Sequence, residues 1–172
     1  MFLLAACGTE FSEELTIEGP SRIQVDALGP VATPGLRLSD GTAPKGVAWR
    51  LSREGIVRLA GSQLVAEAPG EVDVVGSWQT QEVRFTLEVR VDAQLRFVRT
   101  PAELRVGETV GLRVDGRAGD QAIPAEAIAW TTSAPDVLSV DHGVAVGRDA
   151  GTAYVTAAAW GAEAMAELVV VP

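Results

Sequence analysis

The sequence predicts an all-β chain that folds into two tandem sandwich domains, and three observations carry this prediction. Residues 84–91 alternate strictly between polar and apolar side chains, which is typical of a strand with one solvent-facing side. Short apolar runs recur roughly every 8–12 residues between turn-forming residues. A shift of 81 residues lays the chain over itself. In agreement with these three observations, no segment of adequate length has helical periodicity.

The internal repeat is clearest around two tryptophans. Val47-Ala48-Trp49 falls on Ile128-Ala129-Trp130, and Ala68-Pro69-Gly70 falls on Asp149-Ala150-Gly151. The ends of the two copies also agree, since an alternating apolar series in the first matches one in the second: Val83, Phe85, Leu87 and Val89 against Ala164, Ala166, Leu168 and Val170. The chain therefore contains two copies of a unit of about 80 residues.

Each copy predicts an Ig-like β-sandwich of about seven short antiparallel strands, with a tryptophan on an early-middle strand. Turn chemistry separates the strands at Ser39-Asp40-Gly41, Ala60-Gly61-Ser62, Asp115-Gly116 and Asp141-His142-Gly143. Trp49 and Trp130 are the expected core anchors. Because the chain lacks the cysteine pair of antibody domains, we expect both tryptophans to pack on aliphatic residues alone.

The residues around the tryptophans resemble the bacterial Ig-like domain, group 2. In the first copy, Gly46-Val47-Ala48-Trp49 precedes Gly55-Ile56-Val57 and a segment, 64–74, that contains a Pro-Gly turn. The second copy matches better at the corner in 130–140 and departs at the last turn, where Ala150-Gly151 replaces Pro-Gly. The resemblance implies an Ig-like fold and a spacer or binding role, as in adhesins, surface enzymes and lipoproteins.

The N-terminus predicts where the protein resides. Leu4-Ala5-Ala6-Cys7 resembles the cleavage site of a bacterial lipoprotein, which implies that Cys7 is lipidated and becomes the first mature residue. Gly8 follows it instead of the Asp linked to inner-membrane retention, which implies the outer membrane or cell surface. The alternative is a short apolar N-terminus with a stray thiol, because no basic region and few apolar residues precede Cys7.

These features divide the chain into a signal-peptide remnant (1–6), a polar tether (7–13), domain 1 (14–92) and domain 2 (93–172). The junction Asp92-Ala93-Gln94 is short and poor in Gly and Ser, so we expect the two domains to be arranged end to end with little flexibility between them.

Composition excludes several function classes. The net charge of −9 and pI near 4.6 argue against nucleic-acid binding, which requires a basic face. No apolar stretch approaches the roughly 20 residues of a membrane-spanning helix. Cys7 is the single cysteine, so the chain cannot form an intramolecular disulfide.

We expect no enzymatic activity, no cofactor and no metal. The single histidine, His142, lies in a predicted turn, where its side chain should diverge from that of Asp141 and form no catalytic relay. Calcium is an alternative at Asp115 and Asp120, and also at Asp92, which lies at the domain junction near Asp115 or Glu108. The chain offers no dense run of acidic ligands there, and Arg117 would oppose a cation.

The best candidates for partner contact are Trp160 and Tyr154. The predicted inward series of the penultimate strand is Ala153, Val155, Ala157 and Ala159, which places Trp160 and Tyr154 on the other face. An exposed aromatic side chain near a strand end suits recognition. The alternative is that Trp160 folds over its own edge strand or against the other domain.

The sequence therefore predicts a non-catalytic lipoprotein of the cell envelope, anchored in the membrane through Cys7. It would act as a spacer or binding module for an extracellular or periplasmic protein or glycan. The alternative is a structural subunit of a larger envelope or surface assembly, joined through an exposed strand edge.

Overall fold

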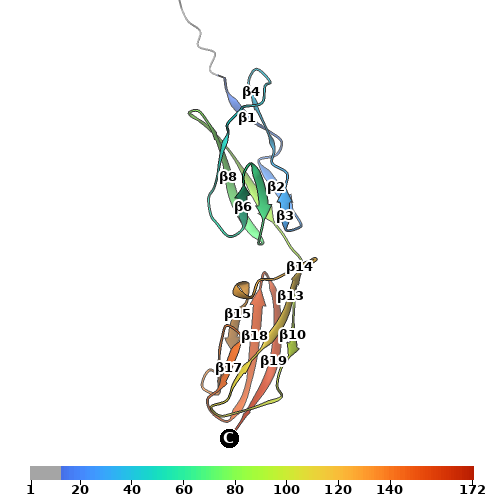
Figure 1. The fold of residues 1–172 in the computed structure, drawn as a ribbon, viewed down its shortest axis with the longest axis vertical. Coiled ribbons are helices and arrows are strands. Elements are labelled where there is room, and N and C mark those ends of the chain that lie inside the picture. The colour runs from blue at the N-terminus through green and yellow to red at the C-terminus, as the bar shows by residue number, and fades with distance from the viewer. Residues whose placement is uncertain (1–12) are drawn as a thin grey trace, which may run out of the picture. The chain divides into compact units, whose positions relative to one another are not determined.

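The computed structural model describes residues 13–172, and both parts of this chain are almost entirely β (Figure 1). Contacts between Cα atoms divide the chain into two compact units: Gly29–Val89 form unit 1 with the residues up to Val25, and Arg90–Pro172 form unit 2 with Asp26–Leu28. The sequence-based limits 14–92 and 93–172 stay predictions about independent folding. Across the described residues, no helix has the length and apolarity needed to cross a membrane.

Unit 1 is an Ig-like sandwich. A four-stranded sheet in the order β2-β9-β8-β5 faces a three-stranded sheet, β3-β7-β6, and β1 pairs with β4. The strands are β1 (Leu15–Glu18), β2 (Arg22–Val25), β3 (Gly29–Val31), β4 (Gly35–Leu38), β5 (Ala48–Leu51), β6 (Val57–Ala60), β7 (Gln63–Ala66), β8 (Gly70–Trp78) and β9 (Gln81–Val89).

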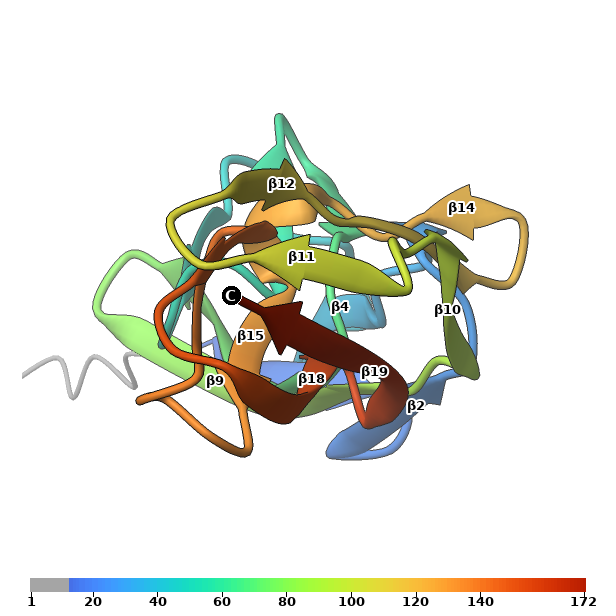
Figure 2. The ribbon, with the colours of Figure 1, turned by 90° about the horizontal axis from the view of Figure 1, so that it is seen from below.

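Unit 2 repeats this topology with the sheets β11-β19-β18-β15, β12-β17-β16 and β10-β13-β14 (Figure 2). Its elements are β10 (Ala93–Arg99), β11 (Glu103–Arg105), β12 (Thr109–Gly111), β13 (Arg113–Ala118), β14 (Gln121–Ala122), a 3-10 helix η1 (Ala125–Ala127), β15 (Ala129–Thr132), β16 (Leu138–Asp141), β17 (Val144–Gly147), β18 (Gly151–Ala159) and β19 (Ala162–Val171). The bounds of β15, β16, β17 and β18 are those of β5, β6, β7 and β8 shifted by 81 residues, so the repeat is confirmed.

The expectation of seven antiparallel strands is wrong in one respect, because the first strand of each copy changes sheet. Pro20 separates β1 from β2, and Pro101 separates β10 from β11. β1 and β10 pair antiparallel with β4 and β13, whereas β2 and β11 pair parallel with the last strands, β9 and β19. Proline cannot donate to a sheet, so it marks the point where the chain leaves one sheet for the other.

A second correction concerns Asp115-Gly116, predicted as a turn but located inside β13. A Cβ atom on Gly116 would lie 2.7 Å from Cδ2 of Leu95 and 3.1 Å from Cβ of Ile123. The glycine therefore permits close approach of neighbouring side chains and does not reverse the chain.

Close packing of a side chain also explains why both β8 and β18 begin with a glycine. A Cβ atom on Gly70 would lie 2.7 Å from Cδ1 of Ile56, and one on Gly151 would lie 3.0 Å from Cγ2 of Val137. Both glycines have positive φ, 142° and 158°. The corner preceding β6 or β16 thus packs directly on the turn that enters the penultimate strand.

The tryptophans correct the expectation of purely aliphatic packing. Trp49 meets the edge of Phe85, with ring centroids 6.1 Å apart and planes at 79°. Trp130 meets Phe97 in the same manner, at 6.0 Å and 69°. Both tryptophans are half-buried, and Trp130 packs against the unit 2 core, whose buried members are Leu104, Leu112, Leu138, Ala145, Ala153, Val155, Leu168 and Val170.

Candidate interaction surface

Cys7, the predicted lipidation site, lies outside the described residues, and its lipidation stays a prediction. The two predicted contact residues, Trp160 and Tyr154, both belong to the hairpin of β18 and β19, and the structure does not bring them together. They are six residues apart, which corresponds to roughly 20 Å along an extended strand.

Trp160 occupies the first position of the turn between β18 and β19, followed by Gly161. Its φ of 52° lies in the left-handed region, which is unusual for a bulky residue. The indole is half-buried and packs against a small cluster of Ala118, Ile123 and Ala159. Trp160 therefore contacts residues of unit 2, and its role in partner contact stays a prediction.

Tyr154 is held on the outer face of the four-stranded sheet of unit 2. Its backbone N–H donates to Oγ of Ser133 at 2.9 Å, and the Ser133 N–H donates to the Tyr154 carbonyl at 2.9 Å. Ser52 and Asp73 form the same pair of bonds in unit 1. Tyr154 is 44% exposed and lies opposite Glu167. A hydrogen bond to Glu167, followed by the charge of that carboxylate, raises the pKa of the Tyr154 phenol.

His142 lies in the predicted turn between β16 and β17, but its side chain does not diverge from that of Asp141. His142 Nδ1 and Asp141 Oδ1 are 2.6 Å apart, and both side chains are almost fully exposed. His142 adopts a left-handed φ of 46° in this turn.

Asp115, one of the acidic residues considered for calcium, is engaged by arginines. Asp115 accepts from Nη2 of Arg96 at 2.9 Å and lies 3.9 Å from Nε of Arg117. Within residues 13–172, no group of three or more His, Cys, Asp or Glu is arranged to hold a metal ion.

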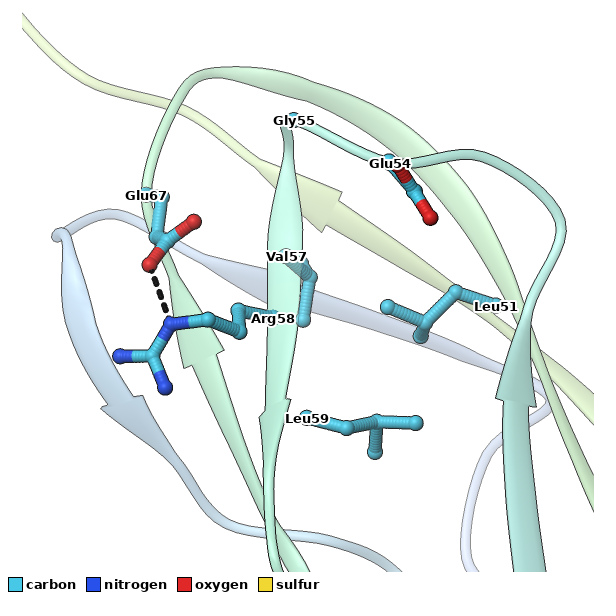
Figure 3. Close-up of a pocket in the computed structure, with 7 residues that line it drawn as sticks. All are labelled: Leu51, Glu54, Gly55, Val57, Arg58, Leu59 and Glu67. Carbon is cyan, nitrogen blue, oxygen red and sulfur yellow. Dashed lines mark hydrogen bonds and ion pairs between the residues drawn. The ribbon is translucent and has the colours of Figure 1, made fainter.

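An apolar groove of about 500 Å³ opens in unit 1 beside β5 and β6 (Figure 3). Leu51, Val57 and Leu59 form its apolar lining, and an ion pair from Nε of Arg58 to Glu67, at 2.6 Å, lies at its side. β5 and β6 are each the last strand of their sheets, so the groove lies beside two strand edges.

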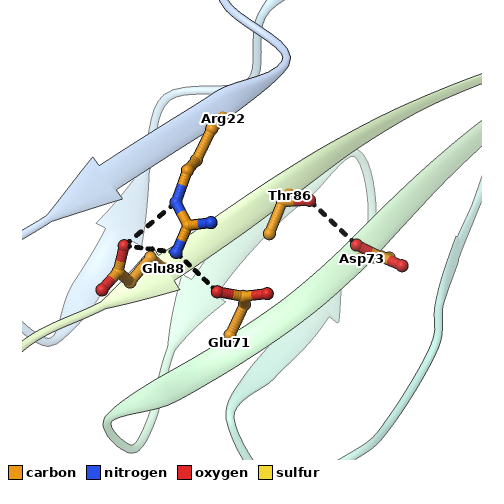
Figure 4. A network of polar contacts seen from close by, with 5 residues as sticks. All are labelled: Arg22, Glu71, Asp73, Thr86 and Glu88. Carbon is orange, nitrogen blue, oxygen red and sulfur yellow. Dashed lines mark hydrogen bonds and ion pairs between the residues drawn. The ribbon is translucent and has the colours of Figure 1, made fainter.

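The outer face of the four-stranded sheet of unit 1 carries a network of ion pairs (Figure 4). Arg22 joins Glu88 and Glu71 through Nη2 at 2.8 Å and 2.6 Å. On the adjacent row, the Thr86 hydroxyl donates to Asp73 at 3.0 Å. Each carboxylate in the network has a donor from another strand of the sheet.

Arginines also cover the apolar residue in the middle of this face. Val75 is only 5% exposed although it points outward, and its cross-strand partners are Arg50 and Arg84. Arg50 pairs with Glu82 at 2.7 Å, and the arginine stems shield the valine from water. We call this outer surface of β2, β9, β8 and β5 the ion-pair face.

The corresponding surface of unit 2 has different chemistry. We call it the platform and define it by the outward residues of β11, β15, β18 and β19: Glu103, Arg105, Ala129, Thr131, Thr152, Tyr154, Thr156, Ala158, Glu163, Met165, Glu167, Val169 and Val171.

At the centre of the platform, uncharged residues replace the arginines. Met165 stands at the position of Arg84 and is 66% exposed, Thr131 stands at that of Arg50, and Thr156 replaces the covered Val75. Among the described residues, no ion pair links two side chains of the platform. Sequence reasoning found Tyr154 but missed Met165, although aligning the repeat reveals the exchange with Arg84.

Comparison with known proteins found solved structures of low similarity to the chain. No family model matches it, and no curated protein matches it. A crystal structure of domains 4 and 5 of the S-layer protein SbsC aligns with 13% identity and a TM-score of 0.43, covering 92% of this chain and 98% of that one. A structure of rSbsC aligns with 12% identity and a TM-score of 0.42, covering 92% of this chain and 28% of that one.

A tandem of titin Ig domains aligns with 14% identity and a TM-score of 0.43, covering 92% of this chain and 96% of that one. These likenesses carry no functional conclusion. Our assignment of both units as Ig-like β-sandwiches rests on their sheet topology.

Proposed function

We propose that this protein is a non-catalytic binding module of the bacterial cell envelope, in which unit 2 contacts a macromolecular partner and unit 1 serves as a spacer. The platform would be the contact surface. Cys7 would attach the module to the membrane, and each unit would be a bacterial Ig-like domain of group 2.

One observation carries this proposal: two sheets with the same topology have outer faces of opposite chemical character. The ion-pair face satisfies its charges internally and covers Val75. The platform leaves Met165 and Tyr154 exposed beside carboxylates that have no ion pair among the described residues. Exposed apolar side chains rimmed by polar groups are typical of an interaction site.

A binding assay with matched variants tests the proposal. The full chain carrying Cys7→Ser would be incubated with envelope fractions from a bacterium that expresses it, and the bound fraction measured. We expect Met165→Arg to reduce binding about ten-fold, and the mirror variant Arg84→Met to leave it unchanged. Equal binding by both variants would refute a role for the platform.

The lipid anchor has a separate test. The intact mass of the native protein should begin at Cys7 and include acyl chains, and Cys7→Ser should remain unprocessed or appear in the soluble fraction. Recovery of native protein with Met1 attached and a free thiol would contradict the anchor.

A structural subunit of a larger assembly is the second candidate, and the groove in unit 1 favours it. Edge strands β5 and β6 beside an apolar groove could accept a strand from a neighbouring subunit. Purification in mild detergent separates the candidates. Stoichiometric subunits that dissociate from a Leu59→Lys variant would favour the assembly, whereas a monodisperse monomer would favour the module.

A further inference from the structure

We propose that the partner of the platform is a protein surface with an apolar side chain flanked by lysine or arginine. This inference rests on the proposed function above and adds the chemical class of the partner. Its basis is the arrangement of charged and apolar residues on β19 and the strands beside it.

The centre of the platform is a row of uncharged side chains across three strands. Met165 lies opposite Thr156, and Thr156 lies opposite Thr131. Met165 is 66% exposed, and an unbranched, polarisable methionine adapts its shape to apolar partner groups. This row provides an apolar contact point without a charged group at its centre.

Carboxylates lie on both sides of that contact point. Glu163 and Glu167 occupy the positions two residues before and after Met165, so they point to the same face at roughly 7 Å from it along the strand. Both are exposed, and neither has an ion-pair partner among residues 13–172. Tyr154 contributes a hydrogen bond to Glu167 but no positive charge.

The remaining charged residues of the platform lie toward its other end. Glu103 is aligned with Val169, and Arg105, the single cation of the platform, is aligned with Val171. Glu163 and Glu167 therefore give the centre a local excess of negative charge. A partner with cationic groups on either side of an apolar side chain complements this pattern.

The same charges disfavour other occupants. A second copy would bring Glu163 and Glu167 against the same carboxylates, and the whole chain already carries a net charge of −9. An acidic glycan would meet the same repulsion.

Carbodiimide cross-linking, which joins a carboxylate to a lysine amine with loss of water, provides a direct test. Envelope fractions bound by the full chain carrying Cys7→Ser would be cross-linked and analysed by mass spectrometry. We expect amide links from Glu163 or Glu167 to lysines of another protein. The double variant Glu163→Gln with Glu167→Gln should lose these links, and Glu82→Gln, at the position equivalent to Glu163, should keep them.

Binding affinity should follow the same charges. Raising the salt concentration from about 0.1 M to about 1 M shortens the Debye length from about 10 Å to about 3 Å, so binding should weaken at least five-fold. The double glutamine variant should bind at least five-fold more weakly at low salt and show little salt dependence. Thermal melts of each variant confirm that it is folded.

The outcomes distinguish the two proposals. In one outcome, Met165→Arg abolishes binding, but neither added salt nor the double glutamine variant changes it. This outcome would overturn the inference of a cationic partner and leave the proposed function standing. Binding that Met165→Arg leaves unchanged would overturn the proposed function itself. Cross-links to Lys45, the only lysine of this chain, in a covalent species of twice the mass of the chain would identify a second copy and overturn the inference.

Discussion

The two units build the same sandwich but obtain the aromatic partner of their tryptophan from opposite ends of the repeat. Phe85, which meets Trp49, lies on the last strand, β9, and its equivalent in unit 2 is Ala166. Phe97, which meets Trp130, lies on the first strand, β10, and its equivalent in unit 1 is Thr16. The comparison teaches that core volume can be supplied from a different strand while strand positions stay constant.

The largest expected effect comes from removing one anchor. Trp49→Ala should destabilise unit 1 by about 3 kcal/mol, because it leaves a cavity beside Phe85. Unit 2 has its own anchor and core, so it should remain folded. Hydrogen exchange resolved by peptide would report each unit separately.

Trp130→Ala is the matched experiment and should unfold unit 2 while sparing unit 1. The opposite result would be one unfolding transition shared by both units and lost equally with either substitution. The two units would then form one cooperative structure.

A smaller effect should distinguish the two tryptophan environments. Trp49 lies over Gly76, where an added Cβ would be 2.9 Å from Cζ3 of the indole, whereas the equivalent Ala157 of unit 2 is fully buried. Gly76→Ala should therefore cost about 1–3 kcal/mol through overpacking. Chemical denaturation would measure this loss of stability. A stabilising result would show that the indole can move away from the added methyl group without loss of stability.

The reverse change, Ala157→Gly, should destabilise unit 2 by about 1 kcal/mol, because it removes a buried methyl group and adds backbone freedom. Opposite substitutions at one repeat position should thus both destabilise their units.

A still smaller effect on stability should distinguish the ion-pair face of unit 1 from the platform of unit 2. Arg50→Ala breaks the ion pair with Glu82 and uncovers Val75, which should cost about 0.5–1 kcal/mol and less at high salt. Thr131→Ala, at the equivalent position of unit 2, should change stability less and show no salt dependence. Urea titrations of both variants at two salt concentrations would measure these changes in stability. Equal losses of stability in the two variants would contradict the contrast between the two faces.

The smallest effect concerns the titration of Tyr154. Because Glu167 raises the pKa of the phenol, the protonated form is favoured in the folded state. The associated stabilisation is present below the pKa of an unfolded tyrosine and is lost as pH rises through the folded pKa.

Tyr154 is the only tyrosine, so phenolate absorbance reports it directly. Glu167→Gln should move the absorbance midpoint to lower pH. A midpoint that did not move would show that Glu167 does not interact with the phenol.

Local patterns were sufficient to predict the β class, the repeat and the inward series of the penultimate strand. Ala153, Val155, Ala157 and Ala159 are all buried, as alternation indicated. Side-chain direction along a strand and the tendency to form a turn depend on residues that are neighbours in the chain, so the sequence is sufficient to predict them.

Contacts between distant strands required the tertiary structure. The sequence does not show which sheet receives β2, that Phe97 meets Trp130, or that Leu95 and Ile123 require Gly116 inside a strand. The candidate site follows the same division: alternation along the strand predicts that Tyr154 faces outward, whereas strand pairing established that the cross-strand neighbours of Met165 are uncharged.

The amino-acid sequence by itself therefore determined where the strands run and which side chains of each strand face inward. The tertiary structure decided which strands pair, what each tryptophan packs against, and which outer face is left without internal ion pairs. The physical reason is that strand pairing and side-chain packing join residues far apart in the chain, and the energies of those contacts depend on the whole assembled sheet.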